Sequence, residues 1–275
     1  MIKADQYFKD NLANILNNGT EDLNPRPKYK DGKEAHSLFI TQVFEKYDIS
    51  NGEYPITTLR NTAIKTGIKE IMWIYLHQSN SLKDAKDLGI NWWGNWDIGN
   101  GTIGKRYGYT VKKYNLFNKL IVNLMKEPFS RRHIINLWQE SDFSEDDKGL
   151  KPCAYETLWS VRQIKDKLYL DMTLNQRSSD YITAGYINKT QYVALMMIVC
   201  LHLNKIVGKE LYTCGFFSHF VQNLHIYDRH IEAAVEIMHR ESGNQPTMSL
   251  DKNFNFSFTG LEQGKKLDSE LEIAI

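Results

Sequence analysis

Residues 152–180 read PCAYETLWSVRQIKDKLYLDMTLNQRSSD, and this stretch decides how the chain folds. Between Leu158 and Gln176, apolar and polar residues alternate on both sides of the charged centre RQIKDK. Alternation with a period of two is typical of strands that bury one face, and a polar break between two such runs indicates a β-hairpin. The hairpin separates Cys153 from Arg177 and is the first element that the sequence predicts.

The flanking sequence predicts helices and strands in a mixed order. A polar stretch rich in Pro, Lys and Gly (25–34) is expected to be a loop, and the aromatic, glycine-rich stretch NWWGNWDIGNGTIG (91–104) is typical of a loop that walls a site. No repeat or linker is visible, so we expect one α+β domain over residues 1–275. Helices are expected over 5–16, 62–77, 114–126, 190–206 and 228–240, and strands over 37–44 and 218–227.

Composition excludes several classes of protein. The 34 basic and 33 acidic residues give a net charge of +1, so we expect no DNA binding and no attachment to a membrane surface. Three scattered cysteines without a CxxC pair argue against a disulfide framework and a structural zinc site, and we expect no metal. The N-terminus lacks an apolar signal segment, and the apolar run 192–203 is shorter than the roughly 20 residues that span a bilayer. These features favour a cytoplasmic protein.

Cys153 is the first candidate for chemistry. A lone cysteine is most often a buried, inert thiol, and it becomes reactive only where a neighbouring cation lowers its pKa. Arg177 is the candidate cation. Together with Ser178 it also forms a plausible phosphate grip, because arginine presents a planar fork of donors and serine adds a hydroxyl. Taken singly, these residues are more often a core thiol and a solvated hairpin end than parts of a site.

Further polar residues could complete a nucleotide site. Arg131 and Arg132 form a second candidate grip, although an isolated basic pair usually belongs to a solvated face. A buried Asn188 would offer one acceptor and two donors, which matches the N–H and carbonyl of uracil. His225 and Tyr227 lie two residues apart, so a strand would turn both to the same side, where they could bind a sugar hydroxyl.

As a set, these segments resemble the thymidylate synthase family. The resemblance covers nearly the whole chain and is densest in four segments: SRRHIINLWQ (130–139), PCAYET (152–157), NQRSSD (175–180) with Asn188 eight residues later, and HIYDRH (225–230). It implies a mixed β-sheet packed by helices and a homodimer that forms through the sheet. It also implies thymidylate synthase chemistry: reductive methylation of dUMP to dTMP, in which 5,10-methylenetetrahydrofolate supplies the carbon unit and the hydride.

The resemblance also assigns roles to residues. Cys153 would attack C6 of the uracil, Arg177 would stabilise its thiolate, and Asn188 would read the ring. Glu70 would relay protons, and Tyr107 would assist removal of the C5 proton. The implied dUMP-binding set is Arg26, Arg131, Arg132, Arg177, Ser178, Asn188, His225 and Tyr227, with Arg131 and Arg132 donated across the dimer interface. The implied folate-binding set is Asp180, Trp93 and Ile275, the last closing over the site to exclude water.

The sequence also departs from the family pattern. Ala154 follows the nucleophile where many members have histidine, and the hairpin is about four residues longer than usual. The other departures are Gly94, Tyr109-Thr110, Leu158, Thr183 to Tyr186, and Gln222-Asn223. None of these departures removes a core catalytic residue. We expect their effects to fall on substrate choice and turnover.

Four alternatives arise at the level of sequence. A dUMP hydroxymethylase would share the fold and the first steps, with water replacing the hydride; a dCMP hydroxymethylase is disfavoured because cytosine calls for a carboxylate in place of Asn188. A silent binder of nucleotide or RNA would have no need for Cys153, Glu70 and Tyr107 together. A hydrolase triad of Ser178, His225 and Asp180 lacks a nucleophile elbow.

Overall fold

The computed structural model describes residues 1–143, 149–261, 266–268 and 271–275, and its frame is a seven-stranded mixed sheet. The strand order is β1-β2-β7-β5-β4-β3, and the short β6 pairs with β7. Neighbouring strands run antiparallel except for β7, which is parallel to β5 and β6. The strands are β1 (Thr20–Glu21), β2 (Ser37–Asp48), β3 (His133–Asn136), β4 (Ala154–Ile164), β5 (Lys167–Gln176), β6 (Ser179–Asp180) and β7 (Tyr212–Tyr227). The expected α+β class is confirmed.

The predicted hairpin is confirmed as β4 and β5. Ile164 pairs with Lys167, so the turn consists of two residues, and Lys165 takes the positive φ of +55° that this tight turn needs. The alternation is strict in β5, where every second residue from Leu168 to Gln176 is buried. The first strand begins earlier than predicted, at Ala154, so the hairpin carries Cys153 and Arg177 directly at its two ends. The Arg177 N–H donates to the Cys153 carbonyl at 2.9 Å.

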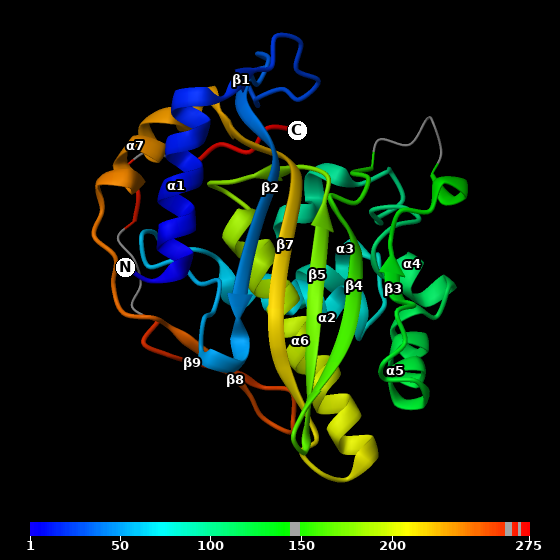
Figure 1. Cartoon of the computed structure of the whole chain (residues 1–275). Helices are drawn as coiled ribbons and strands as arrows, with labels where there is room; N and C mark the ends of the chain where they lie inside the picture. Colours follow the sequence, from blue (N-terminus) through cyan, green and yellow to red (C-terminus); the bar gives the residue numbers. More distant parts are fainter. Residues whose placement is uncertain (144–148, 262–265, 269–270) are drawn as a thin grey trace.

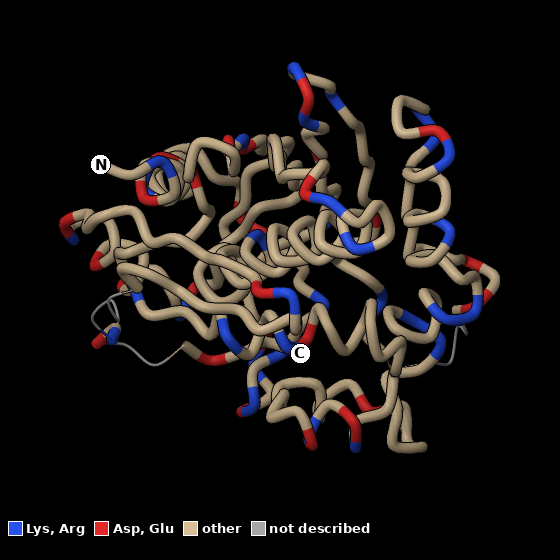
Figure 2. Tube along the Cα trace, turned by 90° about the horizontal axis from the view of Figure 1, so that it is seen from below, with Lys and Arg blue, Asp and Glu red and all other residues tan. Residues whose placement is uncertain are grey.

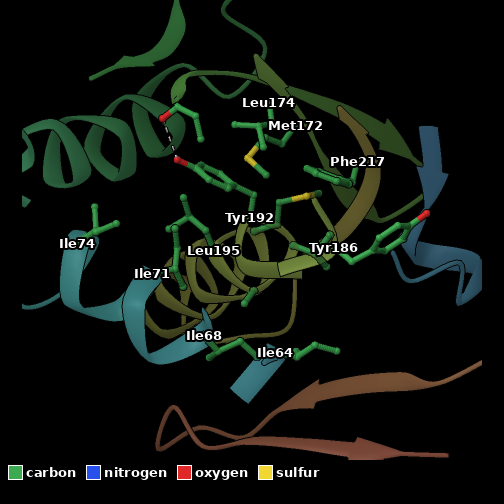
Figure 3. Packing of buried hydrophobic residues seen from close by; sticks show 14 of the residues in the cluster. Ile64, Ile68, Ile71, Ile74, Met172, Leu174, Tyr186, Tyr192, Leu195 and Phe217 are labelled. Atoms are coloured by element: carbon green, nitrogen blue, oxygen red, sulfur yellow. Dashed lines mark hydrogen bonds between the residues drawn. The ribbon is translucent and has the colours of Figure 1, made fainter. Parts of the chain in front are cut away.

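Two helices cover one face of the sheet, α2 (Ile64–Tyr75) and α6 (Gly185–Val207) (Figure 1). Figure 3 shows the isoleucines of α2 facing aromatic and aliphatic side chains of α6, with β5 and β7 beyond them. Helix α6 is long and apolar enough to cross a membrane, but 14 of its 23 residues are buried in this core, as expected of the predicted core helix. The two helices approach closely at Gly67, where an added Cβ would lie 2.6 Å from the Ile187 side chain.

The remaining helices surround this layer. Helices α1 (Lys3–Asn18) and α7 (Ile231–His239) lie at the β2 edge, while α4 (Gly108–Lys113) and α5 (Leu116–Lys126) lie at the β3 edge (Figure 1). Short α3 (Leu82–Asp87) and the 3-10 turns η1 (Ile49–Asn51), η2 (Trp92–Trp96), η3 (Glu140–Asp142) and η4 (Asp228–His230) complete this set. A separate hairpin pairs β8 (Thr247–Leu250) with β9 (Phe256–Thr259).

Several boundaries differ from the sequence prediction. Strand β2 continues past Phe44 to Asp48 because the buried Glu45 is neutralised within the core, and α6 begins at Gly185 instead of Thr190. The predicted helix 228–240 is a 3-10 turn followed by α7. The strands β3, β8 and β9 and the helices α3 and α4 were not predicted, because segments of four to six residues carry too little periodicity.

The other face of the sheet is not covered by helices (Figure 1). Large apolar side chains are exposed there, including Phe44, Ile134 and Leu158, which are 55%, 49% and 38% exposed. Figure 2 shows basic and acidic residues interspersed along the chain, in agreement with the net charge of +1. The uncovered face of the sheet therefore carries exposed apolar side chains, in a chain whose basic and acidic residues are otherwise mixed.

Candidate active site

A cavity of about 300 Å³ opens where the ends of the β4–β5 hairpin meet α2, η2 and the first turns of α6. It gathers residues from distant parts of the sequence. Nine of the fourteen predicted site residues line it: Glu70, Trp93, Tyr107, Cys153, Ser178, Asp180, Asn188, His225 and Tyr227. The chain therefore folds most of the candidate chemistry into one place.

Cys153 lies directly before β4 and lines the cavity. Its backbone N–H donates to the hydroxyl of Tyr107 at 3.2 Å, which fixes the two residues relative to each other. Burial raises the pKa of the Cys153 thiol, and the positive charges of Arg177 and Arg26 oppose this rise. The thiol is therefore neutral in the free protein at neutral pH, with two arginines near enough to favour its ionisation.

Arg177 is held by the chain segment that carries the cysteine. Its Nε donates to the Pro152 carbonyl at 3.0 Å, and its Nη2 donates to the Lys151 carbonyl at 2.8 Å. A guanidinium has five N–H donors, so these two bonds orient the fork and leave donors for an anion. Ser178, the next residue, lines the cavity. This arrangement is compatible with the predicted phosphate grip.

Tyr107 occupies a strained position beside the cavity. Its φ of +52° is unusual for a residue with a side chain, and it immediately precedes α4. The next residue has to be glycine, because a Cβ on Gly108 would lie 2.0 Å from the Ser79 carbonyl oxygen. The Tyr107 ring packs edge-on against Trp93 at 5.3 Å, and burial raises the pKa of its hydroxyl. The strained backbone at Tyr107 therefore holds a protonated hydroxyl at a fixed position next to Cys153.

Glu70 lies in α2 and is almost fully buried. Its Oε1 accepts from the indole N–H groups of Trp92, at 2.8 Å, and Trp93, and its Oε2 accepts from the Gln191 amide. Burial raises the pKa of the Glu70 carboxyl, and these three hydrogen bonds lower it in part. A carboxyl with a raised pKa exchanges protons more readily near neutral pH, as a proton relay requires.

Asn188 lies in the first turn of α6 and lines the cavity through a side chain held by two glutamines. Its Oδ1 accepts from Gln176 Nε2 at 3.2 Å, and its Nδ2 donates to Gln191 Oε1 at 3.0 Å. Sequence reasoning missed both glutamines and also Trp92 and Trp96, which line the same cavity. The aromatic composition of 91–104 was the available signal for the tryptophans, whereas the glutamines had none.

His225 and Tyr227 face the same side of β7, as predicted, and both line the cavity. His225 Nδ1 hydrogen-bonds Asn223 Oδ1 at 3.0 Å. This partner is neither Ser178 nor Asp180, the two residues that a hydrolase triad would require. Burial lowers the pKa of His225, so its imidazole is neutral. Asp180 reaches the cavity because β6 aligns it beside His225.

The other five predicted residues do not line the cavity. Arg26 is exposed in the 25–34 loop, while Arg131 and Arg132 line a separate shallow hollow with residues 126–130. The backbone of Ile275 pairs with Lys28, so Ile273 and Ala274, not Ile275, line the cavity. Arg177 points its fork at the carbonyls of 151 and 152 beside the cavity wall.

The departures from the family pattern also divide into residues that line the cavity and residues that do not. Ala154, Thr183 and Ala184 line the cavity, so these three alter its wall directly. Leu158 lies on the uncovered face of the sheet, and Gly94 is exposed at the surface of η2. The Asn223 side chain contacts His225, and its backbone N–H donates to the Arg177 carbonyl at 3.2 Å. The departures that can affect substrate choice directly are therefore the three in the cavity wall, whereas Leu158 and Gly94 do not line the cavity.

The described residues contain no cluster of metal ligands. Within residues 1–143, 149–261, 266–268 and 271–275, no three His, Cys, Asp or Glu side chains gather closely enough to hold an ion. Cys200 and Cys214 lie 3.8 Å apart at their sulfur atoms, away from the cavity.

Comparison with known proteins agrees with the family resemblance over almost the whole chain. The thymidylate synthase family model matches residues 6–265. The thymidylate synthase of Lactococcus lactis subsp. cremoris is 51% identical over 254 residues, covering 91% of this chain and 88% of the relative; that of Streptococcus pneumoniae strain 70585 is 48% identical with the same coverage. The thermostable thymidylate synthase A from Bacillus subtilis superposes with a TM-score of 0.86 at 30% identity, covering 98% and 99% of the two chains. The chain belongs to the thymidylate synthase family.

Proposed function

We propose that this member of the thymidylate synthase family uses Cys153 as the nucleophile in the reductive methylation of dUMP to dTMP. Family membership makes the chain a methyltransferase with 5,10-methylenetetrahydrofolate as co-substrate. The observation that carries the assignment of Cys153 is its position: it is the one thiol of the three that lines the cavity, between Tyr107 and the arginine that follows the hairpin.

The first step is addition of the Cys153 sulfur to C6 of the uracil. The thiolate is the reactive form, and burial disfavours it, so ionisation depends on the positive charges of Arg177 and Arg26. Addition at C6 makes C5 nucleophilic toward the one-carbon unit of the co-substrate. The negative charge that develops on the uracil oxygen is stabilised by a donor of Asn188, which is already oriented before substrate arrives.

Proton transfers are assigned to Glu70 and Tyr107. The raised pKa of Glu70 suits a group that takes and returns protons at the pyrimidine carbonyl. Tyr107 keeps its proton and holds its hydroxyl next to Cys153, where the C5 proton has to leave. Trp93 packs against Tyr107 and completes an apolar wall, which keeps water away from the methylene intermediate.

The phosphate and sugar are assigned to groups at the edge of the cavity. Arg177 and Ser178 follow the hairpin, and Arg26 comes from the loop tied to the C-terminal tail through Lys28. His225 and Tyr227 take the deoxyribose hydroxyl. The resemblance to the family supports Arg131 and Arg132 as donors to the site of a second subunit, and their exposure far from their own cavity agrees with that role.

A homodimer formed through the uncovered face of the sheet completes this proposal. Exposed Phe44, Ile134 and Leu158 give that face the apolar character of a subunit interface. The single hydrophobic cluster that links α1, α2, α6 and the sheet supports one domain over 1–275. The composition supports a cytoplasmic location.

The folate co-substrate fits the tryptophan-rich end of the cavity. Trp92, Trp93 and Trp96 offer flat apolar surface for a pterin ring, and the Asp180 carboxylate offers acceptors for its N–H groups. The tail would close this end with Ile273 and Ala274 at the cavity and Ile275 anchored outside it. Methylenetetrahydrofolate then supplies the carbon unit and the hydride and leaves as dihydrofolate.

The test is to incubate the purified protein with dUMP and methylenetetrahydrofolate, following dihydrofolate by absorbance and the nucleotide by mass. Dihydrofolate in equal amount to dTMP supports the proposal. Hydroxymethyl-dUMP without dihydrofolate would instead show that water completes the reaction. Cys153→Ser should abolish product, whereas Cys214→Ser, a matched thiol outside the cavity, should leave turnover unchanged; equal loss in both variants would refute the assignment of Cys153.

A further inference from the structure

A primary amide can read either uracil or cytosine. Uracil presents an N–H donor beside a carbonyl acceptor, while cytosine presents a ring acceptor beside an amino donor. Rotating the Asn188 amide by half a turn exchanges its oxygen and its nitrogen, and so exchanges the base that it fits. An asparagine therefore selects uracil only if something else determines which way round the amide lies.

Gln176, at the end of β5, determines the position of the oxygen. Its Nε2 donates both to the Ser178 backbone carbonyl at 2.9 Å and to Asn188 Oδ1 at 3.2 Å. Its Oε1 accepts from His219 Nε2 at 2.9 Å. Burial lowers the pKa of His219, so this imidazole is neutral and can carry its one N–H on Nε2. Reversing the Gln176 amide would set its oxygen against the Ser178 carbonyl, and two oxygens cannot share a hydrogen bond.

Gln191, one turn after Asn188 on α6, determines the position of the nitrogen. Its Nε2 donates to the Gly67 backbone carbonyl at 3.0 Å and to Glu70 Oε2, and its Oε1 accepts from Asn188 Nδ2 at 3.0 Å. Reversing this amide would set its oxygen against a carbonyl and a carboxylate. The lack of a side chain at Gly67 permits the contact, because a Cβ there would lie 3.2 Å from the Gln191 Cγ.

The two glutamines therefore form a directional chain of hydrogen bonds from His219 to Glu70. All its buried members have one compatible arrangement, fixed at each end by a backbone carbonyl. Asn188 is its central member. After these bonds, the second lone pair of Asn188 Oδ1 and the second hydrogen of Nδ2 remain for a base in the cavity, and this is the pattern that uracil complements.

We propose that Gln176 and Gln191 are positioning residues that hold the Asn188 amide in the orientation that selects uracil over cytosine. The inference rests on the proposed function, in which Asn188 reads the base. Reversal of Asn188 would face nitrogen with the Gln176 nitrogen and oxygen with the Gln191 oxygen, so two hydrogen bonds oppose the cytosine-reading state. Gln191 also joins the base-reading amide to the Glu70 proton relay.

The experiment is calorimetric titration of the full-length protein with dUMP and with dCMP, comparing wild type with Gln191→Met. Methionine keeps the length of the side chain and removes both the acceptor for Asn188 and the donor to Glu70. One net hydrogen bond is worth about 0.5–1.5 kcal/mol, so the ratio of the dCMP Kd to the dUMP Kd should fall by about 3- to 10-fold. Gln176→Met removes the opposite bond and should lower the same ratio.

Controls separate orientation from packing. Thr190→Val alters a neighbouring buried residue of α6 that does not line the cavity, and should leave the ratio unchanged. Should Gln191→Met fail to fold by circular dichroism, Gln176→Met decides the question.

The outcomes are distinguishable. A wild-type protein that binds dCMP as tightly as dUMP would contradict the proposed function of Asn188 and this inference together. A wild-type preference for dUMP that persists in both methionine variants, or a loss of affinity by the same factor for both nucleotides, would overturn the positioning role alone.

Discussion

Replacing Lys189 should reveal how strongly the core depends on one buried ion pair. The Lys189 ammonium lies 2.7 Å from both oxygens of Glu45, joining α6 to β2, and the two side chains are 1% and 2% exposed. Glu45 also accepts from the hydroxyls of Tyr47, at 2.6 Å, and Tyr181, at 3.1 Å, and from Asn11 at 3.0 Å. The carboxylate is thus fully satisfied, but its charge is balanced by Lys189.

Lys189→Met keeps a long apolar stem and removes the positive charge. Breaking a buried pair by removing one partner costs about 3–5 kcal/mol, because a charge is left without compensation in the interior. We expect this loss in the free energy of unfolding. The double variant Lys189→Met/Glu45→Gln removes the orphaned charge and keeps an acceptor for the tyrosines, so it should recover at least about half of the loss.

Urea unfolding followed by circular dichroism measures the effect. Protein concentration has to be equal in all samples, because subunit association would contribute to apparent stability. Lys83→Met is the matched control: its ion pair with Asp87 is exposed and screened by solvent, so the change should leave the urea midpoint close to that of wild type. A single variant that loses under 1 kcal/mol, or a double variant no more stable than the single, would refute the view that Glu45 depends on Lys189 for charge compensation.

Four further predictions follow from the site and its supports. Cys153→Ser should lower turnover at least roughly 1,000-fold in the dihydrofolate assay while dUMP still binds; near-normal turnover would contradict the mechanism. Asn188→Asp should shift preference toward dCMP, and an unchanged ratio of kcat/KM for the two nucleotides would count against its role as base reader. Gly108→Ala should cost about 1–3 kcal/mol or more in urea unfolding, since its Cβ would meet the Ser79 carbonyl at 2.0 Å; an unchanged midpoint would show that the turn adapts. The lowered pKa of His219 gives stability that is present above its unfolded value near pH 6.5 and lost as pH falls, by at most about 1.4 kcal/mol per pH unit; His219→Phe should flatten this slope between pH 7 and 5, and an identical slope would exclude His219 as its source.

Much of the fold could be predicted where the pattern of burial has a single period. The hairpin alternates strictly in β5, and α2 places Ile64, Ile68 and Ile71 on one buried face. Helix α6 was predicted from its apolar run alone, because nearly every face of its first four turns is buried. Its start was placed five residues late, since Gly185 and the polar Asn188 and Lys189 do not look like a core helix.

The sequence predicted which residues belong to the candidate site, but not how they are arranged in space. The nine predicted residues that line the cavity lie in segments that the resemblance to the family identified together. The positions of Arg26 and Ile275 were not predictable, because both depend on the pairing of the 25–34 loop with the tail through Lys28. Gln176 and Gln191 were missed for a related reason: a buried amide acquires its role from partners on other elements, and no local pattern records those partners.

The cavity owes its geometry to groups that do not react. Arg177 is aimed by two backbone carbonyls, and Tyr107 is held in a strained conformation by the close approach of Gly108 to Ser79. Strain of this kind persists only where the surroundings leave no alternative, so the hydroxyl beside Cys153 is fixed before substrate binds. Donors that are already oriented need no reorganisation as charge develops, and that is where most electrostatic stabilisation of a transition state arises. Burial raises the pKa of the Cys153 thiol and the charges of Arg177 and Arg26 oppose this rise, so the same rigid polar frame sets how readily the proposed nucleophile ionises.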